Sequence, residues 1–345
     1  MGRLTSTEQD CAERAAAEPM RGQVIIWAGI NSGSRNLDGL AKMAELLANE
    51  FAALPGEVRL VEPAPVDAID ATGSTVQQQH GRNVHLKVRP DAPVQLLFTG
   101  HMDTVFDVEH EFQYTRWLEE GVLGGPGVAD MKGGIAVMLA ALKAVEAGGA
   151  AANLGYEVVL NSDEEVGSPG SAALIAEAAR GKRAALTYEP AALPDGTLAG
   201  ARPGSGNFVF VVRGRSAHAG RNPEEGRNAV VAAADLALRL ERGKGPRLSV
   251  NPARIDGGGP NNVVPDLAVL HVNLRPATPD DEARARALIE STVAMVGAEH
   301  DVAIEPHGGF GRPPKPMTPE AEDLFRLVQQ AGADLGQAIG WQPSG

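Results

Sequence analysis

Several side chains that can ligate a metal ion or transfer a proton lie in the first 190 residues. All but one follow a predicted strand, and Asp130 ends a Gly-rich loop that enters a helix. The set comprises His101, Asp103, Asp130, Glu164, Glu165 and Glu189. A divalent cation such as Zn²⁺ takes imidazole and carboxylate ligands, and one carboxylate can bridge two ions. These residue types therefore indicate a two-metal centre.

Two short spacings within this set have a chemical use. His101 and Asp103 lie two residues apart, so their side chains point to one side of an extended segment, where the histidine can bind metal and the aspartate can orient it. Glu164 and Glu165 are adjacent, and neighbouring negative charges repel unless a cation neutralises them. One glutamate acting as a ligand and one as a general base would account for the pair. A His-x-Asp spacing often arises by chance, and two adjacent glutamates usually lie in a solvated turn, whereas all of these residues together at successive strand ends favour a metal site.

The elements that must position these side chains alternate between strand and helix patterns. From residue 8 to residue 53 the pattern is helical, apart from a break at Asn31–Ser34. The apolar run Val94–Thr99 is typical of a strand buried on both faces, and it ends just before His101. The elements predicted after it are a helix at Gly133–Ala147, a strand at Tyr156–Asn161, a helix at Gly170–Ala179 and a strand at Arg183–Tyr188. This alternation predicts a mostly parallel sheet, and ligands bind at the carboxyl ends of such strands.

The pattern changes after Pro203 to a β-α-β-β-α-β order, which is that of a ferredoxin-like module. Its predicted elements are strand Asn207–Arg213, helix Asn228–Leu240, strand Arg247–Ile255, strand Leu267–Arg275, helix Asp280–Val296 and strand Asp301–Pro306. The turn-rich stretch Gly308–Pro316 follows, and helix-prone sequence resumes at Pro319. We therefore predict an α/β catalytic domain formed by residues 1–203 and 315–345, interrupted by an inserted ferredoxin-like (α+β) domain at residues 204–314.

Composition excludes several classes of partner. The 345 residues carry 31 Lys and Arg against 44 Asp and Glu, a net charge of −13 that repels nucleic acids and anionic lipids. Cys11 is the one cysteine, which excludes an intramolecular disulfide and a cysteine-based zinc site. The sequence has no apolar run of about 18 residues and no signal-like N-terminus, so we expect a cytoplasmic protein without a membrane span.

Four motifs resemble those of one family of co-catalytic zinc hydrolases. They are TGHMDTV at 99–105, GPGVADMKGG at 125–134, DEEVGS at 163–168 and EP at 189–190. In this order and spacing they resemble the family of glutamate carboxypeptidases, acetylornithine deacetylases, succinyl-diaminopimelate desuccinylases and aminoacylases. GRSAHAG at 214–220 and GPNNVVP at 259–265 resemble the motifs of that family's lid and dimerisation domain. The resemblance extends to about residue 335.

The resemblance implies a role for each acidic residue. Asp130 would bridge two zinc ions, His101 and Glu189 would complete one site, and Glu165 would ligate the other zinc. Cobalt is an alternative metal. The peptide bond between Asp130 and Met131 would be cis.

The catalytic roles implied by the resemblance fall to two further residues. Asp103 would orient His101, and Glu164 would be the general base that takes a proton from water and passes it to the departing amine. The reaction would be hydrolysis of an amide bond in a peptide or N-acyl amino acid, next to a free carboxylate.

The resemblance also assigns functions to the inserted domain. His218 would reach the active site of a partner subunit and stabilise the developing oxyanion, so a homodimer formed through the lid domain is expected. Asn262 and Arg275 resemble lid residues that hold the substrate's carboxylate, and Arg312 is a further candidate for the same task.

One feature departs from the family pattern. Family members continue into a terminal segment with a last histidine that completes the second zinc site, whereas this sequence ends at Gly345 and has no histidine after His307. The second site then has only Asp130 and Glu165, so we expect one tightly held metal, one weak or absent metal, and impaired activity in an apparently truncated chain.

Three functional readings follow. The GPG motif at 125–127, just before Asp130, and the stretch Gly167–Ser171 favour a carboxypeptidase of the glutamate carboxypeptidase type. An N-acyl amino acid deacylase of the acetylornithine deacetylase or desuccinylase type is the first alternative. The second is a catalytically impaired or silent dimeric homologue that lacks the last metal ligand.

Overall fold

The computed structural model describes residues 4–149 and 151–344, which form two compact units. The first unit runs up to Val66 and resumes from Gln78 to Pro190. The second contains Asp67–Gln77 and the chain from Ala191 onward. The domain limits expected from the sequence stay predictions, and their outer ends at residues 1 and 345 lie outside the described residues.

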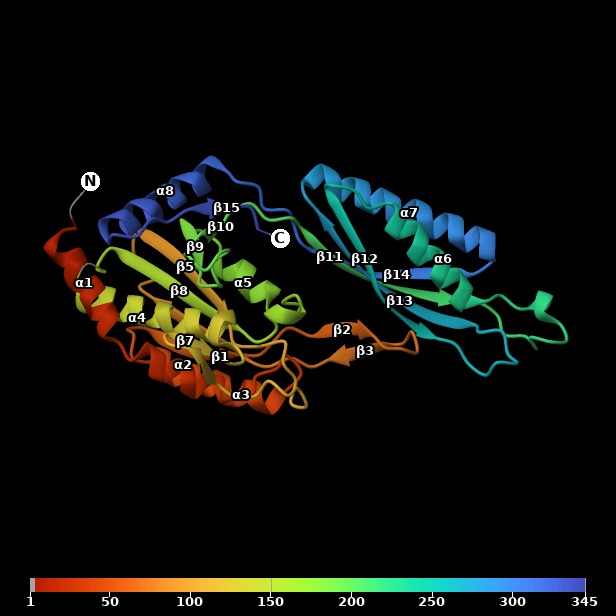
Figure 1. The fold of residues 1–345 in the computed structure, drawn as a ribbon, viewed down its shortest axis with the longest axis horizontal. Helices are drawn as coiled ribbons and strands as arrows, with labels where there is room; N and C mark the ends of the chain where they lie inside the picture. The colour runs from red at the N-terminus through yellow and green to blue at the C-terminus, as the bar shows by residue number, and fades with distance from the viewer. Residues whose placement is uncertain (1–3, 150, 345) are drawn as a thin grey trace. The chain divides into compact units, whose positions relative to one another are not determined.

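Three helices begin the first unit (Figure 1): α1 Ser6–Ala17, α2 Met20–Ala28 and α3 Leu37–Phe51. The expectation of unbroken helix from residue 8 to the break at 31–34 was wrong, because α1 ends before Pro19. A residue that precedes proline disfavours the helical conformation, and Glu18 is extended here. Asn36 caps α3, whose buried face packs against the sheet.

The central sheet of the first unit has the strand order β1-β4-β8-β5-β9. Its strands are β1 Glu57–Val61, β4 Asn83–Val88, β5 Val94–His101, β8 Leu154–Asn161 and β9 Ala184–Thr187. β8, β5 and β9 are neighbours and parallel, while β4 runs antiparallel to β1 and β8. The predicted mostly parallel sheet is therefore confirmed, with one reversed strand. Because three adjacent strands run the same way, their carboxyl ends share one edge.

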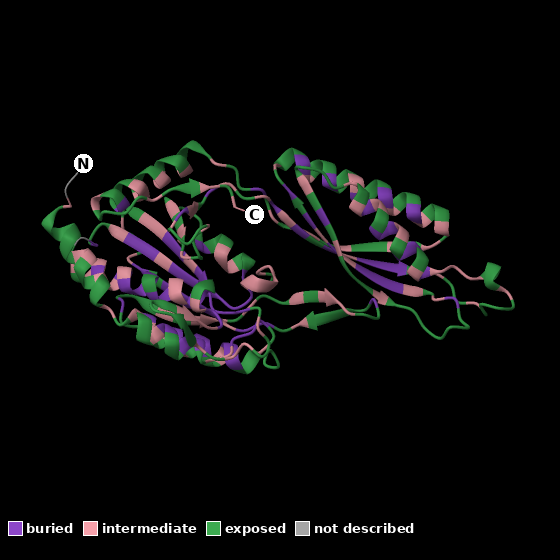
Figure 2. Cartoon of the chain, viewed as in Figure 1, coloured by how far each residue is buried: buried purple, intermediate pink, exposed green. Residues whose placement is uncertain are grey.

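Helices cover both faces of this sheet. α2, α3 and α4 (Gly133–Ala147) contribute to the larger core, around Trp27, Phe51 and Tyr156. α5 (Ala172–Ala178) packs against Leu97 and Val159 in a smaller cluster. Figure 2 shows buried residues along the central strands and on the helix faces turned toward them. A hairpin of β6 (Arg116–Glu119) and β7 (Val122–Gly124) precedes the turn that leads into α4.

The second unit contains the expected ferredoxin-like module, and its element order is confirmed. The elements are β11 Ser205–Arg213, α6 Ala229–Arg242, β12 Leu248–Gly257, β13 Leu267–Pro276, α7 Pro279–His300 and β14 Ala303–Arg312. The strands form an antiparallel sheet in the order β12-β13-β11-β14, packed against α6 and α7 around Phe210, Leu236 and Leu270.

The last strand of this module is longer than predicted. The sequence indicated a turn from Gly308, but β14 continues to Arg312. Gly308 has φ +84° and lies against Asn207, where a Cβ would come within 2.2 Å of the backbone oxygen. Glycine here permits a close approach of two strands rather than a chain reversal.

Smaller elements complete the second unit. A hairpin joins β2 (Val66–Ile69) to β3 (Thr75–Gln78), and β10 (Leu198–Ala199) pairs in parallel with β15 (Trp341–Gln342). The predicted helix after Pro319 is present as α8, Pro319–Asp334. Within the described residues, no helix combines the length and apolarity needed to cross a membrane.

Candidate metal centre

The predicted ligands lie at the shared carboxyl edge of the central sheet. His101 is the last residue of β5, and Glu189 follows β9 by two residues. Glu164 and Glu165 form the 3₁₀ turn Glu164–Val166 after β8. Three neighbouring parallel strands thus bring together side chains that are up to 88 residues apart in the sequence.

Two carboxylates converge on the Nε2 atom of His101. Nε2 lies 2.9 Å from Asp130 Oδ1 and 3.6 Å from Glu189 Oε1. The His101 side chain is only 1% exposed. Burial disfavours a charged imidazole, but the carboxylates of Asp103, Asp130 and Glu189 outweigh it and raise the pKa of His101 to about 12. The centre therefore strongly favours a positive charge at this position.

Asp103 connects His101 to the glutamate turn. Its buried carboxylate accepts hydrogen bonds from the backbone N–H groups of Glu164 and Glu165, both at 3.1 Å, and from Ser34 Oγ at 2.7 Å. His101 Nδ1 lies 3.3 Å from Asp103 Oδ1 and 3.0 Å from the Asp103 backbone oxygen. A proton on Nδ1 leaves Nε2 free to act as a ligand.

Asp130 reaches the centre from a tight turn, Val128–Lys132, that precedes α4. The Asp130–Met131 peptide is cis, as the resemblance implied. Lys132 is buried, and its Nζ donates to the backbone oxygens of Trp27 (3.2 Å) and Ile30 (2.9 Å). These contacts hold the turn against the last turn of α2 and the residues just after it. His101 in turn lowers the pKa of Asp130.

The donor atoms group in a way that fits a divalent cation. One ligand atom each from His101, Asp130 and Glu165 lie within 4.8 Å of one another, and so do those from His101, Glu164 and Glu189. Burial raises the pKa of Glu165 to about 7, and the nearby carboxylates of Asp130, Asp103 and Glu164 add to this effect while His101 opposes it. A bound cation would relieve this crowding of negative charge. One imidazole with several carboxylates is a donor set that zinc accepts.

The residues of the second unit that were predicted to contact the substrate fall into two groups. The backbone of His218 pairs with Val263, and Ala219 N–H donates to the Asn262 oxygen at 2.9 Å, so His218 and Asn262 lie on adjoining loops. Arg275 and Arg312 lie at the opposite end of the sheet, beside the first residues of β11. The nine residues of β11 separate the groups by about 30 Å at 3.3 Å per residue. Within one chain, His218 and Asn262 are thus far from Arg275 and Arg312.

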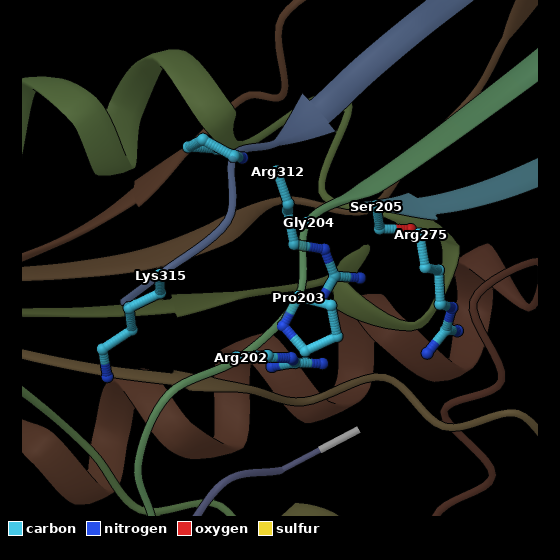
Figure 3. A pocket seen from close by; sticks show the side chains of 8 residues that line it. Arg202, Pro203, Gly204, Ser205, Arg275, Arg312 and Lys315 are labelled. Atoms are coloured by element: carbon cyan, nitrogen blue, oxygen red, sulfur yellow. The ribbon is translucent and has the colours of Figure 1, made fainter. Parts of the chain in front are cut away.

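Arg275 and Arg312 share a pocket with two further positively charged side chains, which the sequence motifs did not indicate. The pocket has a volume of about 270 Å³ and is lined by Arg202, Ser205, Arg275, Arg312 and Lys315, together with Pro203, Gly204 and Pro313 (Figure 3). Arg202 and Lys315 are joined by backbone hydrogen bonds of 2.9 and 2.8 Å. Among the residues that the structure describes, no carboxylate forms an ion pair with Arg202, Arg275 or Lys315. Neither Arg202 nor Lys315 lies in a recognisable motif, and only the isolated β-bridge between them shows that they are neighbours.

Comparisons with known proteins match a large part of the chain. The model of the family "Peptidase family M20/M25/M40" matches residues 97–344. Carboxypeptidase G2 from Pseudomonas sp. (strain RS-16) is 30% identical over 315 residues, which cover 89% of this chain and 72% of that protein. Succinyl-diaminopimelate desuccinylase from Maricaulis maris (strain MCS10) is 29% identical over 229 residues, which cover 61% of this chain and 58% of that protein.

Solved structures share the fold. The metallo-carboxypeptidase Sso-CP2 from Sulfolobus solfataricus superposes with a TM-score of 0.69 at 15% identity, covering 95% of this chain and 86% of that one. A peptidase from Bacillus subtilis described as dinuclear metal-binding gives a TM-score of 0.59 at 14% identity, covering 94% of this chain and 83% of that one.

Proposed function

Since this chain belongs to peptidase family M20/M25/M40, we propose that it is a zinc-dependent carboxypeptidase that cleaves an amide bond next to a free carboxylate. The observation that carries the proposal is the convergence of Asp130 and Glu189 on His101 Nε2, with the Glu164–Glu165 turn held beside them by Asp103. The family membership supports amide hydrolysis, and the donor set supports the metal.

His101, Asp130 and Glu189 would hold one zinc, and Asp130 and Glu165 would hold a second more weakly. Cobalt could take the place of zinc. When bound, the metal would acidify a water molecule and polarise the amide carbonyl. The dinuclear relative from Bacillus subtilis supports a two-metal arrangement in this fold.

The residues of the chain itself perform the proton transfers in this proposal. Glu164 takes a proton from the attacking water and delivers it to the nitrogen of the departing amine, because that nitrogen must be protonated to leave. Asp103 keeps the Nδ1 proton of His101 in place. Its hydrogen bond from the Glu164 backbone N–H also fixes the position of the base. One buried carboxylate thus orients both a ligand and the base.

The pocket of the second unit supports recognition of a carboxylate. Arg275 and Arg312 are the proposed carboxylate ligands, because a guanidinium offers paired N–H donors to such a group. Arg202 and Lys315 add positive charge to the same pocket. A peptide or N-acyl amino acid with a free carboxylate is therefore the proposed substrate class.

We also propose that the protein acts as a homodimer. The strand length between the two groups of lid residues supports this proposal, because His218 and Asn262 of one chain could serve the substrate held by Arg275 and Arg312 of another. His218 would donate a hydrogen bond to the developing oxyanion.

The single cysteine supports a cytoplasmic location.

A deacylase is the alternative that the likeness to succinyl-diaminopimelate desuccinylase favours. The zinc-loaded chain should be assayed with folylglutamate-type and dipeptide substrates against N-acetyl and N-succinyl amino acids, each with a free or an amidated carboxylate. Faster release from the first group supports the carboxypeptidase, and faster release from the second supports the deacylase. Equal rates with free and amidated carboxylates would contradict the proposed recognition, and the absence of any turnover would favour a catalytically impaired homologue.

A further inference from the structure

The loop that carries Glu164 and Glu165 is held by two buried carboxylates. The first is Asp103, which accepts hydrogen bonds from the backbone N–H groups of both glutamates. The second is Asp163, the residue directly before them, whose side chain is 1% exposed and accepts hydrogen bonds from residues at the end of the loop. Neither the proposed metal sites nor the proposed proton transfers use Asp163.

Asp163 closes the loop by joining its beginning to its end. Its Oδ1 accepts from Asn161 Nδ2 at 3.1 Å and from Ser171 Oγ at 2.5 Å. Its Oδ2 accepts from the backbone N–H groups of Gly170 at 2.6 Å and Ser171 at 3.2 Å. Ser168 N–H also donates to the Asp163 backbone oxygen at 2.7 Å. Four donors to one carboxylate fix the span from the end of β8 to the start of α5.

A buried histidine lies beside this carboxylate. The His80 side chain is also 1% exposed, and its Nδ1 lies 4.0 Å from Asp163 Oδ2. Neither ring nitrogen has a hydrogen-bond partner among the described residues. Ser162 Oγ donates to the Gly81 oxygen at 2.7 Å and so fastens the segment next to His80 onto the same loop. Hydrogen bonds to a carboxylate that is buried away from solvent, as that of Asp163 is, are strong.

We infer that Asp163 is a positioning residue for Glu164 and Glu165, which it holds in place by clamping both ends of their loop. The inference rests on the proposed function, because it assigns Asp163 a part in placing the general base and a ligand. Asp103 accepts hydrogen bonds from the backbone of the two glutamates themselves, whereas the Asp163 clamp joins the beginning of their loop to its end.

Asp163→Asn tests this inference, because the amide would set an NH₂ group against donors on one side of the clamp. We expect kcat to fall about 10- to 100-fold with KM within about threefold of wild type. Hydrogen exchange at the Glu164 and Glu165 amides should also become faster, although Asp103 is intact. This readout does not depend on turnover.

Ser171→Ala provides a milder test in case Asp163→Asn does not fold. It removes one of the four donors, together with an acceptor of Asn161 Nδ2, without adding an opposed donor, so we expect kcat to fall roughly threefold to tenfold with unchanged KM.

Asp70→Asn is the matched control. Asp70 organises the β2–β3 turn in a similar way, accepting from Thr72 N–H at 2.8 Å, Thr72 Oγ1 at 2.6 Å and Ser74 N–H at 3.0 Å. This variant should keep the wild-type kcat and the wild-type exchange at the glutamate amides.

Two results would overturn the inference. One is wild-type kcat and wild-type exchange at Glu164 and Glu165 in a folded Asp163→Asn or Ser171→Ala protein. The other is a loss of activity that follows only the folded fraction, as a purely structural role would give. If the wild-type chain hydrolyses no substrate, the proposed function fails, and the exchange rates still decide the role of Asp163.

Discussion

At the scale of single residues, the centre is governed by competition for His101 Nε2. Without metal, the surrounding carboxylates favour a proton on the imidazole and raise its pKa to about 12. Zinc must displace that proton, so metal binding should release protons and weaken as the pH falls. Asp130 and Glu189 both lie within 3.6 Å of this nitrogen, so we propose that the site they would form with His101 is the stronger of the two.

Zinc content after dialysis tests this ranking. We expect one firmly held zinc per chain, because His101, Asp130 and Glu189 supply three ligands whereas the second site has Asp130 and Glu165. His101→Ala should lose that zinc, and Glu165→Gln should keep it. Two firmly held zinc ions per wild-type chain would contradict the ranking.

At the scale of elements, the site depends on close packing between α4 and the end of β9. A Cβ on Gly134, in the first turn of α4, would lie 1.8 Å from the backbone oxygen of Tyr188, the residue before Glu189. Only glycine allows the helix that follows Asp130 and the strand that precedes Glu189 to approach this closely. The absence of a side chain at Gly134 thus sets how close the two proposed ligands Asp130 and Glu189 can lie.

Gly134→Ala should therefore destabilise the fold by about 1–3 kcal/mol and lower activity, because the clash displaces Glu189 or Asp130. Gly22→Ala is the matched control, since it also lies in a helix but its Cβ would meet no atom within 4 Å. Its stability should be unchanged or slightly raised. Urea unfolding of both variants, with zinc content, gives the comparison, and equal stability of the two would refute the packing argument.

The elements also show how far the sequence predicts the site. Apolar runs located β5, β8 and β9, and because parallel strands end at one edge, they also located His101, Glu164, Glu165 and Glu189. Local pattern could not reveal β14 beyond Pro306, because its glycines are typical of a turn unless the partner strand is known. Arg202 and Lys315 were missed for the same reason, since only pairing between distant segments brings them into one pocket.

At the scale of the whole molecule, the two units contain different parts of the proposed chemistry. The first has the proposed metal ligands and the proposed base, while the second has the cationic pocket and His218. In the proposed homodimer, the separation of His218 from Arg275 along β11 is the reason that a second chain would be needed to bring the two residues to one substrate.

Mixing two inactive variants tests this arrangement. Glu164→Gln and His218→Ala should each be inactive alone, and together they should recover up to about a quarter of wild-type activity, because half of randomly mixed dimers carry one intact site of two. Size-exclusion chromatography with light scattering reports the dimer. No recovery in a mixture of exchanging dimers would show that His218 acts within its own chain.

The proposed role of Glu164 is that of the base in a metal-dependent amide hydrolysis. It is tested most directly by the steady-state rate of zinc-loaded wild type and Glu164→Gln on one N-acyl amino acid substrate, at equal zinc content. The glutamine variant should bind zinc as the wild type does and lose about 10²- to 10⁴-fold in kcat, because it cannot accept the proton of water. Equal kcat values for the two proteins, each with zinc bound, would contradict the claim.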